Sequence, residues 1–335
     1  MSELRLDPTT REWVIMAPER GGRPREFTAP AHRTPEPYLA SCPFCPGNES
    51  RTTGEVASYA DPLTGRWRVR AFENKYPAVR PGGTAERHQD HPLALSVSGV
   101  GVHEVVVESD RHDRLIAEMA DDEVFDVVKV YRDRLQVLSA LDFVRQVVIF
   151  KNHGPSAGTS LEHPHSQIVA MPVVPWHRRH QYDVAARHYD ERGRNLYQEM
   201  VEFELAARVR VVHESPCFVE AHPYASRKPF ETWLLPKTPR ASFADLPDAH
   251  LRDFGCALRD ALRRLNTGLN NPDFNHVLYT AASGDADEPY YCWHLRIYPR
   301  LTAVAGFEIG SGIHINSSLP EETAAFMRGV AETLD

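Results

Sequence analysis

Long hydrophobic runs, cysteine and an excess of positive charge are scarce or missing in this sequence. No apolar stretch approaches the roughly 18 residues that a membrane-spanning helix requires, and the first residues, MSELRLDPTTREWV, contain no apolar signal-peptide core. The formal net charge of −8 argues against a general nucleic-acid-binding surface, although a local site could still bind an anionic nucleotide. We therefore expect a cytoplasmic protein whose partners include neither a membrane nor a nucleic acid.

The five cysteines are too few, and odd in number, for a disulfide framework in a chain of 335 residues. Two of them, Cys42 and Cys45, form a CxxC motif, which is typical of a metal half-site or a redox pair. The turn-forming residues Pro46-Gly47-Asn48 follow directly, whereas a redox CxxC usually opens a helix. We therefore favour a zinc site that takes two more ligands from elsewhere, because the chain contains no second CxxC.

An internal repeat organises the chain, whose 42% hydrophobic and 25% charged residues are ordinary for a soluble protein. A shift of 127 positions lays His103–Val107 over Phe230–Leu234 and Arg132 over Arg259, without a gap across about 70 residues. Both copies read as strand, turn, helix, strand, loop, strand. We predict an α+β fold of two tandem units with antiparallel sheets packed against helices, covering residues 1–195 and 196–335.

The segments outside the repeat are less regular. Residues 80–97 are polar and read as a mobile excursion, residues 176–210 as helices that bridge the two copies, and residues 320–334 as a final helix. Asp121 or Asp122 is a plausible N-cap for the first repeated helix. Ala305–Gly312 reads as a glycine-punctuated loop.

The motif His163-Pro164-His165-Ser166-Gln167 carries the strongest chemical signal. In a strand, residues i and i+2 point to the same face, so both imidazoles and the Gln167 amide would lie together. The loop from Gly154 to Gly158 before it could let backbone N–H groups approach a phosphate. This combination favours phosphoryl or nucleotidyl chemistry over an edge strand with surface histidines. The second copy lacks the HxH pair and reads as a degenerate half.

A family resemblance can be named on these motifs. CPFCPGNE, SDRH, GPSAGTSLEHPHSQ, PFETWLLPK and HLRIYPRL with AGFEIGSG resemble, in the same order, the galactose-1-phosphate uridylyltransferase family. That family is the tandem-motif branch of the histidine-triad superfamily. The resemblance implies a double displacement of galactose metabolism in which UDP-glucose gives its uridylyl group to His165 and a hexose 1-phosphate, such as galactose 1-phosphate, takes it up.

The resemblance also assigns residues. It implies that His165 is the nucleophile, that Gln167 donates to the nucleotidyl phosphate, and that Ser160 with the backbone of Gly158 and Thr159 completes the phosphate cradle. It implies one structural zinc ion, held by Cys42, Cys45, His112 and His163. Further positions match substrate-binding residues of the family. Arg20, Arg23 and Asn74 match residues that hold the nucleotide, Glu308 matches one that contacts the sugar, and Asn152 is a further substrate-binding position. A homodimer whose sugar site is completed by the partner subunit is implied as well.

Some residues depart from the family pattern. Glu162 stands where relatives have Asn or Ser, Trp176–Tyr182 offers no Glu, and Arg296 replaces an expected His, so we predict that a second metal site of some relatives is absent. FKNHGPSAGTS and Ile313–Asn316 resemble the branch that contains ADP-glucose phosphorylases. An adenylyltransferase or phosphorylase using ADP-glucose and phosphate, or an Ap4A-like dinucleotide, therefore stays open. So do a non-catalytic nucleotide-binding module and the roles of Glu162 and His103.

Overall fold

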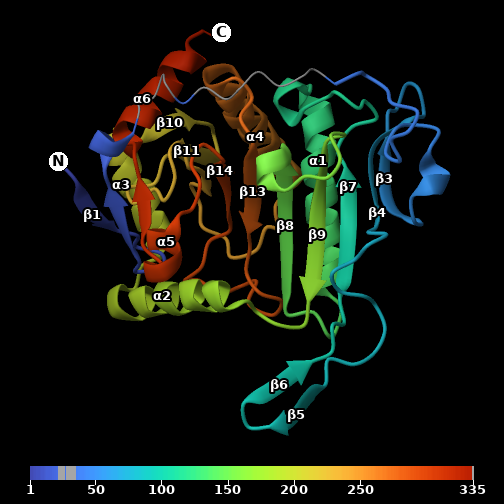
Figure 1. Cartoon of the computed structure of the whole chain (residues 1–335), viewed down its shortest axis with the longest axis horizontal. Coiled ribbons are helices and arrows are strands. Elements are labelled where there is room, and N and C mark those ends of the chain that lie inside the picture. The colour runs from blue at the N-terminus through green and yellow to red at the C-terminus, as the bar shows by residue number, and fades with distance from the viewer. Residues whose placement is uncertain (22–26, 28–34, 334–335) are drawn as a thin grey trace.

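The computed structural model describes residues 1–21, 27 and 35–333. In this part of the chain, one antiparallel sheet of ten strands runs through the molecule (Figure 1). The first half contributes β3 (Glu55–Ala60), β4 (Trp67–Glu73), β7 (Val102–Val107), β8 (Gln146–His153) and β9 (His165–Met171). The second half contributes β10 (Val211–Glu214), β11 (Phe218–Ala221), β12 (Thr232–Pro236), β13 (Phe274–Tyr279) and β14 (His294–Pro299).

The strand order is symmetric about the middle of the sheet. It reads β3-β4-β7-β9-β8-β13-β14-β12-β11-β10, so that β8 and β13 meet at the centre and β9 and β14 flank them. Each half therefore presents the same three repeated strands in mirrored order. The predicted α+β fold with antiparallel pairing is confirmed, and the two units share one continuous sheet.

Two long helices, α1 (Asp121–Ser139) and α4 (Asp248–Leu269), pack on one face of the sheet. Their apolar residues recur every three to four positions, which is the pattern of a helix with one buried face. Val124, Val128 and Leu135 of α1 are buried in the same core as Val106 and Ile168 of the strands. Figure 1 shows α1 behind β7, β8 and β9.

The two helices contact each other through reciprocal ion pairs that follow the repeat. Arg132 Nη1 lies 2.6 Å from Asp248 Oδ1, and Arg259 pairs with Asp121 in the same way. Both residues of the second pair are 127 positions away from their counterparts in the first, so the helices keep the predicted offset.

The offset grows at the last repeated strand. In the first unit Val148 pairs with Val169, whereas Asn275, 127 positions after Val148, pairs with Tyr298, which is 129 positions after Val169. The repeat therefore contains two extra residues between β13 and β14, which the ungapped comparison of sequences could not show.

The other face of the sheet is covered unequally. Over the second half lie α2 (Trp176–Arg192) and α3 (Leu196–Ala207), which form a second apolar core with β11 and β12. A three-stranded sheet of β1 (Glu3–Leu6), β2 (Trp13–Met16) and β15 (His314–Asn316) adjoins α5 (Gly306–Ser311) and α6 (Pro320–Ala331). Over the first half, the Cys42–Cys45 segment packs on Val105 and Val107 of β7.

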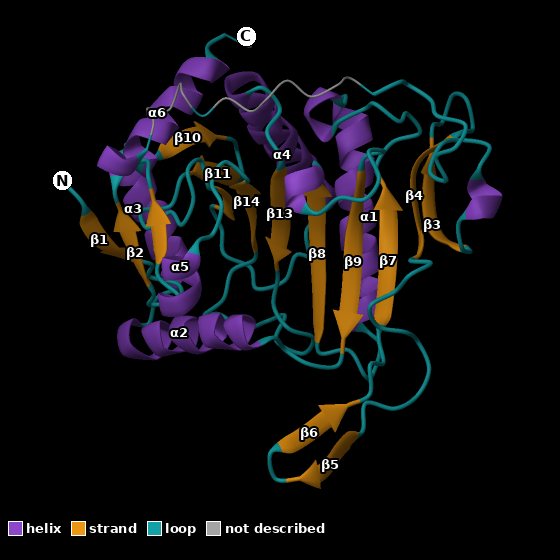
Figure 2. Cartoon of the chain, in the orientation of Figure 1, coloured by secondary structure: helices purple, strands orange, loops and turns teal. Residues whose placement is uncertain are grey.

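Short 3-10 turns complete the described structure: η1 (Pro18–Arg20), η3 (Glu49–Arg51), η4 (Ile116–Glu118) and η5 (Pro155–Ala157). The predicted excursion at 80–97 contains a hairpin of β5 (Arg87–His91) and β6 (Ala94–Val97), which projects away from the sheet (Figure 2). None of the helices in the described ranges is long and apolar enough to cross a membrane.

Two local predictions were wrong. Ala305–Gly312 is not a plain loop, because the Glu308 carboxylate accepts from the Ala305 N–H at 2.8 Å and starts helix α5. Neither Asp121 nor Asp122 is the N-cap of α1: the cap is Ala120, whose N–H donates to the Glu123 carboxylate at 2.6 Å.

Candidate active site and metal site

His165 begins strand β9, and its ring is held in one tautomer. His165 Nδ1 lies 2.9 Å from the His163 carbonyl oxygen, which can only accept, so Nδ1 carries the proton and Nε2 keeps its lone pair. Burial lowers the pKa of His165, and Phe44 packs edge-on against its ring. A neutral imidazole with one free nitrogen is suited to nucleophilic attack.

A buried ion pair lies on the opposite face of the same strands. Lys151 Nζ is 2.5 Å from Glu108 Oε2 and 3.3 Å from the carbonyl oxygen of His165. Burial alone would raise the pKa of Glu108, but the Lys151 ammonium and the Ser166 hydroxyl hold it below its usual value. Because Glu108 follows β7, Lys151 is in β8 and Ser166 is in β9, the pair ties three strands together beneath His165.

Gln167 lies on the same face as His165 and is joined to the neighbouring strands. The Nε2 atom of His103, on β7, lies 2.8 Å from Gln167 Oε1 and 3.2 Å from Asn74 Nδ2. The structure therefore brings Asn74, His103 and Gln167 into one line across β4, β7 and β9. Sequence reasoning left His103 without a role, because its contact depends on the register between β7 and β9.

The glycine loop before β9 is closed by its own hydrogen bonds. The N–H of Gly158 donates to the Pro155 carbonyl at 3.0 Å, and that of Thr159 donates to the Gly154 carbonyl at 3.4 Å. The two N–H groups expected to cradle a phosphate thus serve the loop itself in this structure. Ser160 follows in the same loop, before the buried His163.

Asn152 adds an amide near this loop, fixed from the second unit. Asn152 Oδ1 accepts from Asn275 Nδ2 at 2.8 Å across the junction of β8 and β13. The oxygen is thus engaged, and the Asn152 NH₂ group is the part left to donate to a ligand. Asn275 also donates to the Ala157 carbonyl at 2.9 Å, so it anchors the loop as well. Nothing in the sequence pattern around Asn275 had indicated this contact.

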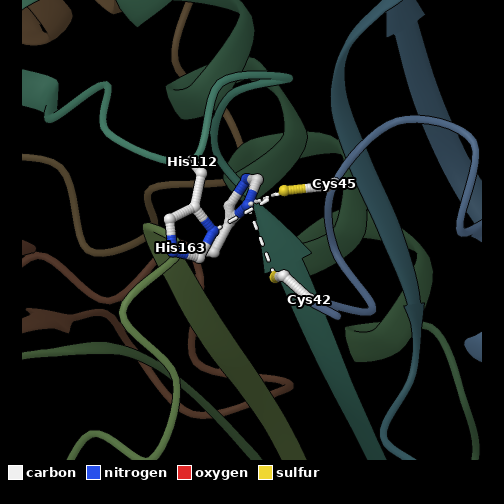
Figure 3. Close-up of side chains that lie close together, drawn as sticks. All are labelled: Cys42, Cys45, His112 and His163. Carbon is white, nitrogen blue, oxygen red and sulfur yellow. Dashed lines mark hydrogen bonds between the residues drawn. The ribbon is translucent and has the colours of Figure 1, made fainter. Parts of the chain in front are cut away.

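The predicted metal ligands come together. Cys42, Cys45, His112 and His163 are all buried, and their ligand atoms lie within 4.8 Å of one another (Figure 3). His163 Nδ1 is 3.8 Å from Cys42 Sγ and 3.6 Å from Cys45 Sγ, while His112 Nδ1 is 3.6 Å from Cys45 Sγ. Three distant parts of the chain therefore build one cluster that could hold a metal ion.

The surroundings of the cluster favour metal ligation. His163 Nε2 donates to the Ser109 carbonyl at 2.8 Å, which turns the Nδ1 lone pair toward the sulfurs, and burial lowers the pKa of His163 to about 4. The N–H groups of Leu39 and Phe44 each donate to a cysteine sulfur at 3.4 Å. Glu162 adds a carboxylate 4.0 Å from His112 Nε2. The donors are thus two sulfurs and two ring nitrogens, and a hydrogen bond fixes the orientation of the His163 ring.

Arg20 and Glu308 lie apart from His165 within this chain. Arg20 ends η1, just after β2, and Glu308 Oε1 accepts from the Ile315 N–H of β15 at 3.3 Å. Because β2 and β15 are paired, the two residues belong to one small region, which Figure 1 shows on the opposite side of the molecule from β7 and β9. Arg23 lies outside the described residues.

The corresponding position in the second unit is filled by the protein itself. His294 Nδ1 donates to the Cys292 carbonyl at 3.0 Å, as His165 does to His163, but Arg296 Nε donates to His294 Nε2 at 2.9 Å. The Arg296 guanidinium lies 3.6 Å from the ring centre of Trp233 and 4.3 Å from that of Tyr279. The free nitrogen is thus occupied, which agrees with a degenerate second half.

The two α+β units thus treat the repeated histidine differently: His165 keeps Nε2 available, whereas His294 Nε2 accepts from Arg296. This is the plan that the resemblance to the tandem histidine-triad class implies. The comparisons define the family. The galactose-1-phosphate uridyl transferase N-terminal domain model matches residues 1–175, and the C-terminal domain model matches residues 179–330. The chain belongs to the galactose-1-phosphate uridyl transferase family, whose named relatives are nucleotidyltransferases.

Two relatives illustrate the breadth of the family. ADP-glucose phosphorylase of Arabidopsis thaliana is 34% identical over 99% of this chain and 93% of that protein, and galactose-1-phosphate uridylyltransferase of Thermotoga maritima is 27% identical over 98% of each. The solved structure of the Arabidopsis enzyme with bound ADP-glucose matches with a TM-score of 0.83 at 33% identity, covering 98% of this chain and 99% of that one. A uridylyltransferase structure matches with a TM-score of 0.76 at 27% identity, covering 100% and 99%.

Proposed function

We propose that this chain transfers a nucleotidyl group through a covalent bond to His165. The observation that carries the proposal is the 2.9 Å hydrogen bond from His165 Nδ1 to the His163 carbonyl, which leaves Nε2 free on a ring whose pKa burial has lowered. Nε2 attacks the α-phosphorus of a nucleoside diphosphate hexose, an N–P bond forms, and the P–O bond to hexose 1-phosphate breaks. A phosphate oxygen of the acceptor then attacks the same phosphorus, and the ring regains its lone pair.

The residues around His165 support both steps. The His163 carbonyl stabilises the positive charge that the ring gains when the N–P bond forms. The amides of Gln167, Asn152 and Asn74 supply N–H donors for the phosphate and the nucleoside, and Ser160 supplies a hydroxyl. No general base is needed for the first step, because the attacking nitrogen carries no proton.

The donor that the family name supports is UDP-glucose, with galactose 1-phosphate as the acceptor of the uridylyl group. A second candidate is adenylyl transfer from ADP-glucose to inorganic phosphate. It is favoured by the higher identity to ADP-glucose phosphorylase, 34% against 27%, and by the TM-score of 0.83 against 0.76. The chemistry at His165 is the same in both.

A zinc ion in the cluster of Cys42, Cys45, His112 and His163 fits this function as a structural support. With Zn–S bonds of ~2.3 Å and Zn–N bonds of ~2.0–2.1 Å, a tetrahedral site places sulfur and nitrogen ~3.5 Å apart, close to the 3.6 Å between Cys45 Sγ and His163 Nδ1. A closed set of four protein ligands takes no part in the chemical steps. It fixes His163, whose carbonyl holds His165.

A homodimer would complete the substrate site. Within one chain Arg20 and Glu308 lie away from His165, yet they share one small region, and the nearby side chains of Phe307 and Ile309 on α5 are exposed. In a dimer this region of one subunit can meet the side of the sheet that carries His165 in the other. Arg20 of the partner subunit would then contact the nucleotide, and Glu308 of the partner subunit would contact the sugar.

The test of the function is isotope exchange between glucose 1-phosphate and the nucleotide sugar, with no second acceptor present. Labelled glucose 1-phosphate is incubated with the protein and either UDP-glucose or ADP-glucose. Double displacement through His165 predicts label in the nucleotide sugar, because the covalent intermediate can react backwards with any hexose 1-phosphate. The donor that exchanges identifies the base. Exchange with neither donor, in protein that binds both, would leave a nucleotide-binding module instead.

A further inference from the structure

His103 lies between two amide side chains that belong to the neighbouring strands. Asn74 follows β4, and its N–H donates to the His103 carbonyl at 2.7 Å. On the other side Gln167 lies diagonally opposite, because its direct partner on β7 is Val105. The His103 side chain is buried and faces the same side of the sheet as Gln167 and His165.

The hydrogen bonds of His103 define its tautomer. The backbone N–H of Ala78 donates to His103 Nδ1 at 3.1 Å. A backbone N–H can only donate, so Nδ1 has the lone pair and the ring proton resides on Nε2. Nε2 lies 2.8 Å from Gln167 Oε1 and therefore donates to it.

This tautomer determines how the Gln167 amide is oriented. With Oε1 bound to His103, the Gln167 NH₂ group is left to donate, and it has no hydrogen-bond partner among the described residues. Asn74 is oriented separately: its Oδ1 accepts from the Tyr76 N–H at 2.9 Å, so its NH₂ group lies 3.2 Å from His103 Nε2, where two donors meet and the ring proton is left to Gln167. The Gln167 side chain thus keeps its donors for an anionic ligand. Turned over, it would present an oxygen to the phosphate instead.

We propose that His103 is a positioning residue for nucleotidyl transfer, which holds the Gln167 amide with its NH₂ group directed at the phosphate that His165 attacks. The inference rests on the proposed function, since it assigns His103 to the reaction at His165. His103 acts through Gln167 and need not touch the substrate.

Two substitutions separate the two contacts of the ring. In His103→Asn the side-chain oxygen can still accept from Ala78, but no N–H reaches Gln167. In His103→Gln the longer amide can donate to Gln167 Oε1. We expect single-turnover formation of nucleotidyl-His165 to slow by about tenfold in His103→Asn, the effect of one lost hydrogen bond, and to recover to within about threefold of wild type in His103→Gln.

The double variant tests whether the effect passes through Gln167. If it does, His103→Asn combined with Gln167→Ala reacts as slowly as Gln167→Ala alone, because the amide to be oriented is already gone. A merely structural role of His103 predicts that the two losses multiply. Multiplying losses, or an unchanged rate in His103→Asn, would overturn the inference.

A third measurement needs no turnover. Nitrogen-15 NMR of the ring, assigned by the signal missing from His103→Asn, should show the proton on Nε2 at neutral pH; a proton on Nδ1 would overturn the inference. Wild-type protein that forms no adduct with either donor contradicts the proposed function, and the role of His103 with it. An adduct in wild type that forms equally fast in His103→Asn contradicts the present inference alone.

Discussion

At the residue scale, backbone carbonyls decide which imidazole nitrogens are available. The carbonyl of His163 binds Nδ1 of His165, and the carbonyl of Ser109 binds Nε2 of His163. Two histidines separated by one residue therefore present opposite nitrogens, one toward substrate and one toward the metal cluster. His163 lies just before β9, and Phe44 packs edge-on against both rings at the start of the strand. The different carbonyls give the two rings different tasks.

His276 offers a test of burial at this scale. Burial lowers its pKa to about 3, although the nearby Glu108 carboxylate opposes the shift, and neither ring nitrogen has a partner among the described residues. A lowered folded-state pKa contributes stability above the unfolded value near 6.5 that is lost as the pH falls toward 3. When the pH falls from 7 to 5, we expect the free energy of unfolding of wild type to fall by about 2 kcal/mol more than that of His276→Leu.

The measurement is urea unfolding of wild type and His276→Leu at both pH values. His250→Leu, at a partly exposed position of α4, is the matched control and should follow wild type. Equal loss of stability in wild type and His276→Leu would contradict a buried neutral His276.

The sequence predicted the site in part, for a physical reason. His165 and Gln167 follow the two-residue period of β9, whereas His163 was expected in the same strand and lies in the bend before it. The CxxC carries its own turn, so local pattern was sufficient there. The contacts of His103 and Asn275 depend on how β7 registers with β9 and how β8 meets β13. Those registers arise from tertiary packing, so no short stretch of sequence contains them.

At the element scale, the metal cluster joins three segments that lie far apart in the sequence. The Cys42–Cys45 segment, the turn with His112 and the start of β9 converge at the four ligands, beside a small apolar cluster of Phe44 with Phe72, Val105 and Val107. Because that apolar cluster is small, ligation of a metal ion would add to the order of the Cys42–Cys45 segment.

We expect about one zinc ion per chain and its loss in Cys42→Ser, because a tetrahedral site with three protein ligands binds more weakly. Cys292→Ser is the matched control, since Cys292 is equally buried but lies outside the cluster. Elemental analysis and thermal unfolding provide the measurement. Protein purified without chelator that contains no zinc would contradict the assignment, as would a metal content unaffected by Cys42→Ser.

The helix pair makes a second prediction at this scale. Asp121 and Asp248 occupy the first turns of α1 and α4 and pair with Arg259 and Arg132. Both aspartates are largely exposed, so each pair is worth less than ~1 kcal/mol. We expect Asp121→Asn and Asp248→Asn to lower the free energy of unfolding by similar small amounts. A loss above ~2 kcal/mol in one variant alone would contradict the equivalence of the two helices.

At the scale of the whole molecule, the two repeated units form one sheet, and different segments cover its two halves. In the first unit the Cys42–Cys45 segment packs on the face around His165, whereas in the second α2 and α3 cover the corresponding face. Arg296 occupies the free nitrogen of His294, and its charge is stabilised by the faces of Trp233 and Tyr279. The second unit thus serves the first by holding the central strands, and through Asn275 it also holds the loop before His165.

The prediction of a catalytic first unit and a degenerate second unit rests on the sequence, and the structure adds three-dimensional detail to it. The sequence showed that the second unit lacks the HxH pair. It could not show that Arg296 donates to the His294 nitrogen that corresponds to the free nitrogen of His165. Nor could it show that the second unit has two more residues between β13 and β14. The first is a side-chain contact, and the second appears in the register between β13 and β14.

The most direct test of the account is the intact mass of the protein after brief incubation with UDP-glucose or ADP-glucose in the absence of acceptor. The account predicts a mass increase of one nucleotidyl group, located by acid-free peptide mapping on His165, lost on addition of the acceptor and absent in His165→Asn. The nucleotide found in the adduct identifies the donor. Consumption of a nucleotide sugar without any adduct, or an adduct of equal yield in His165→Asn, would contradict it.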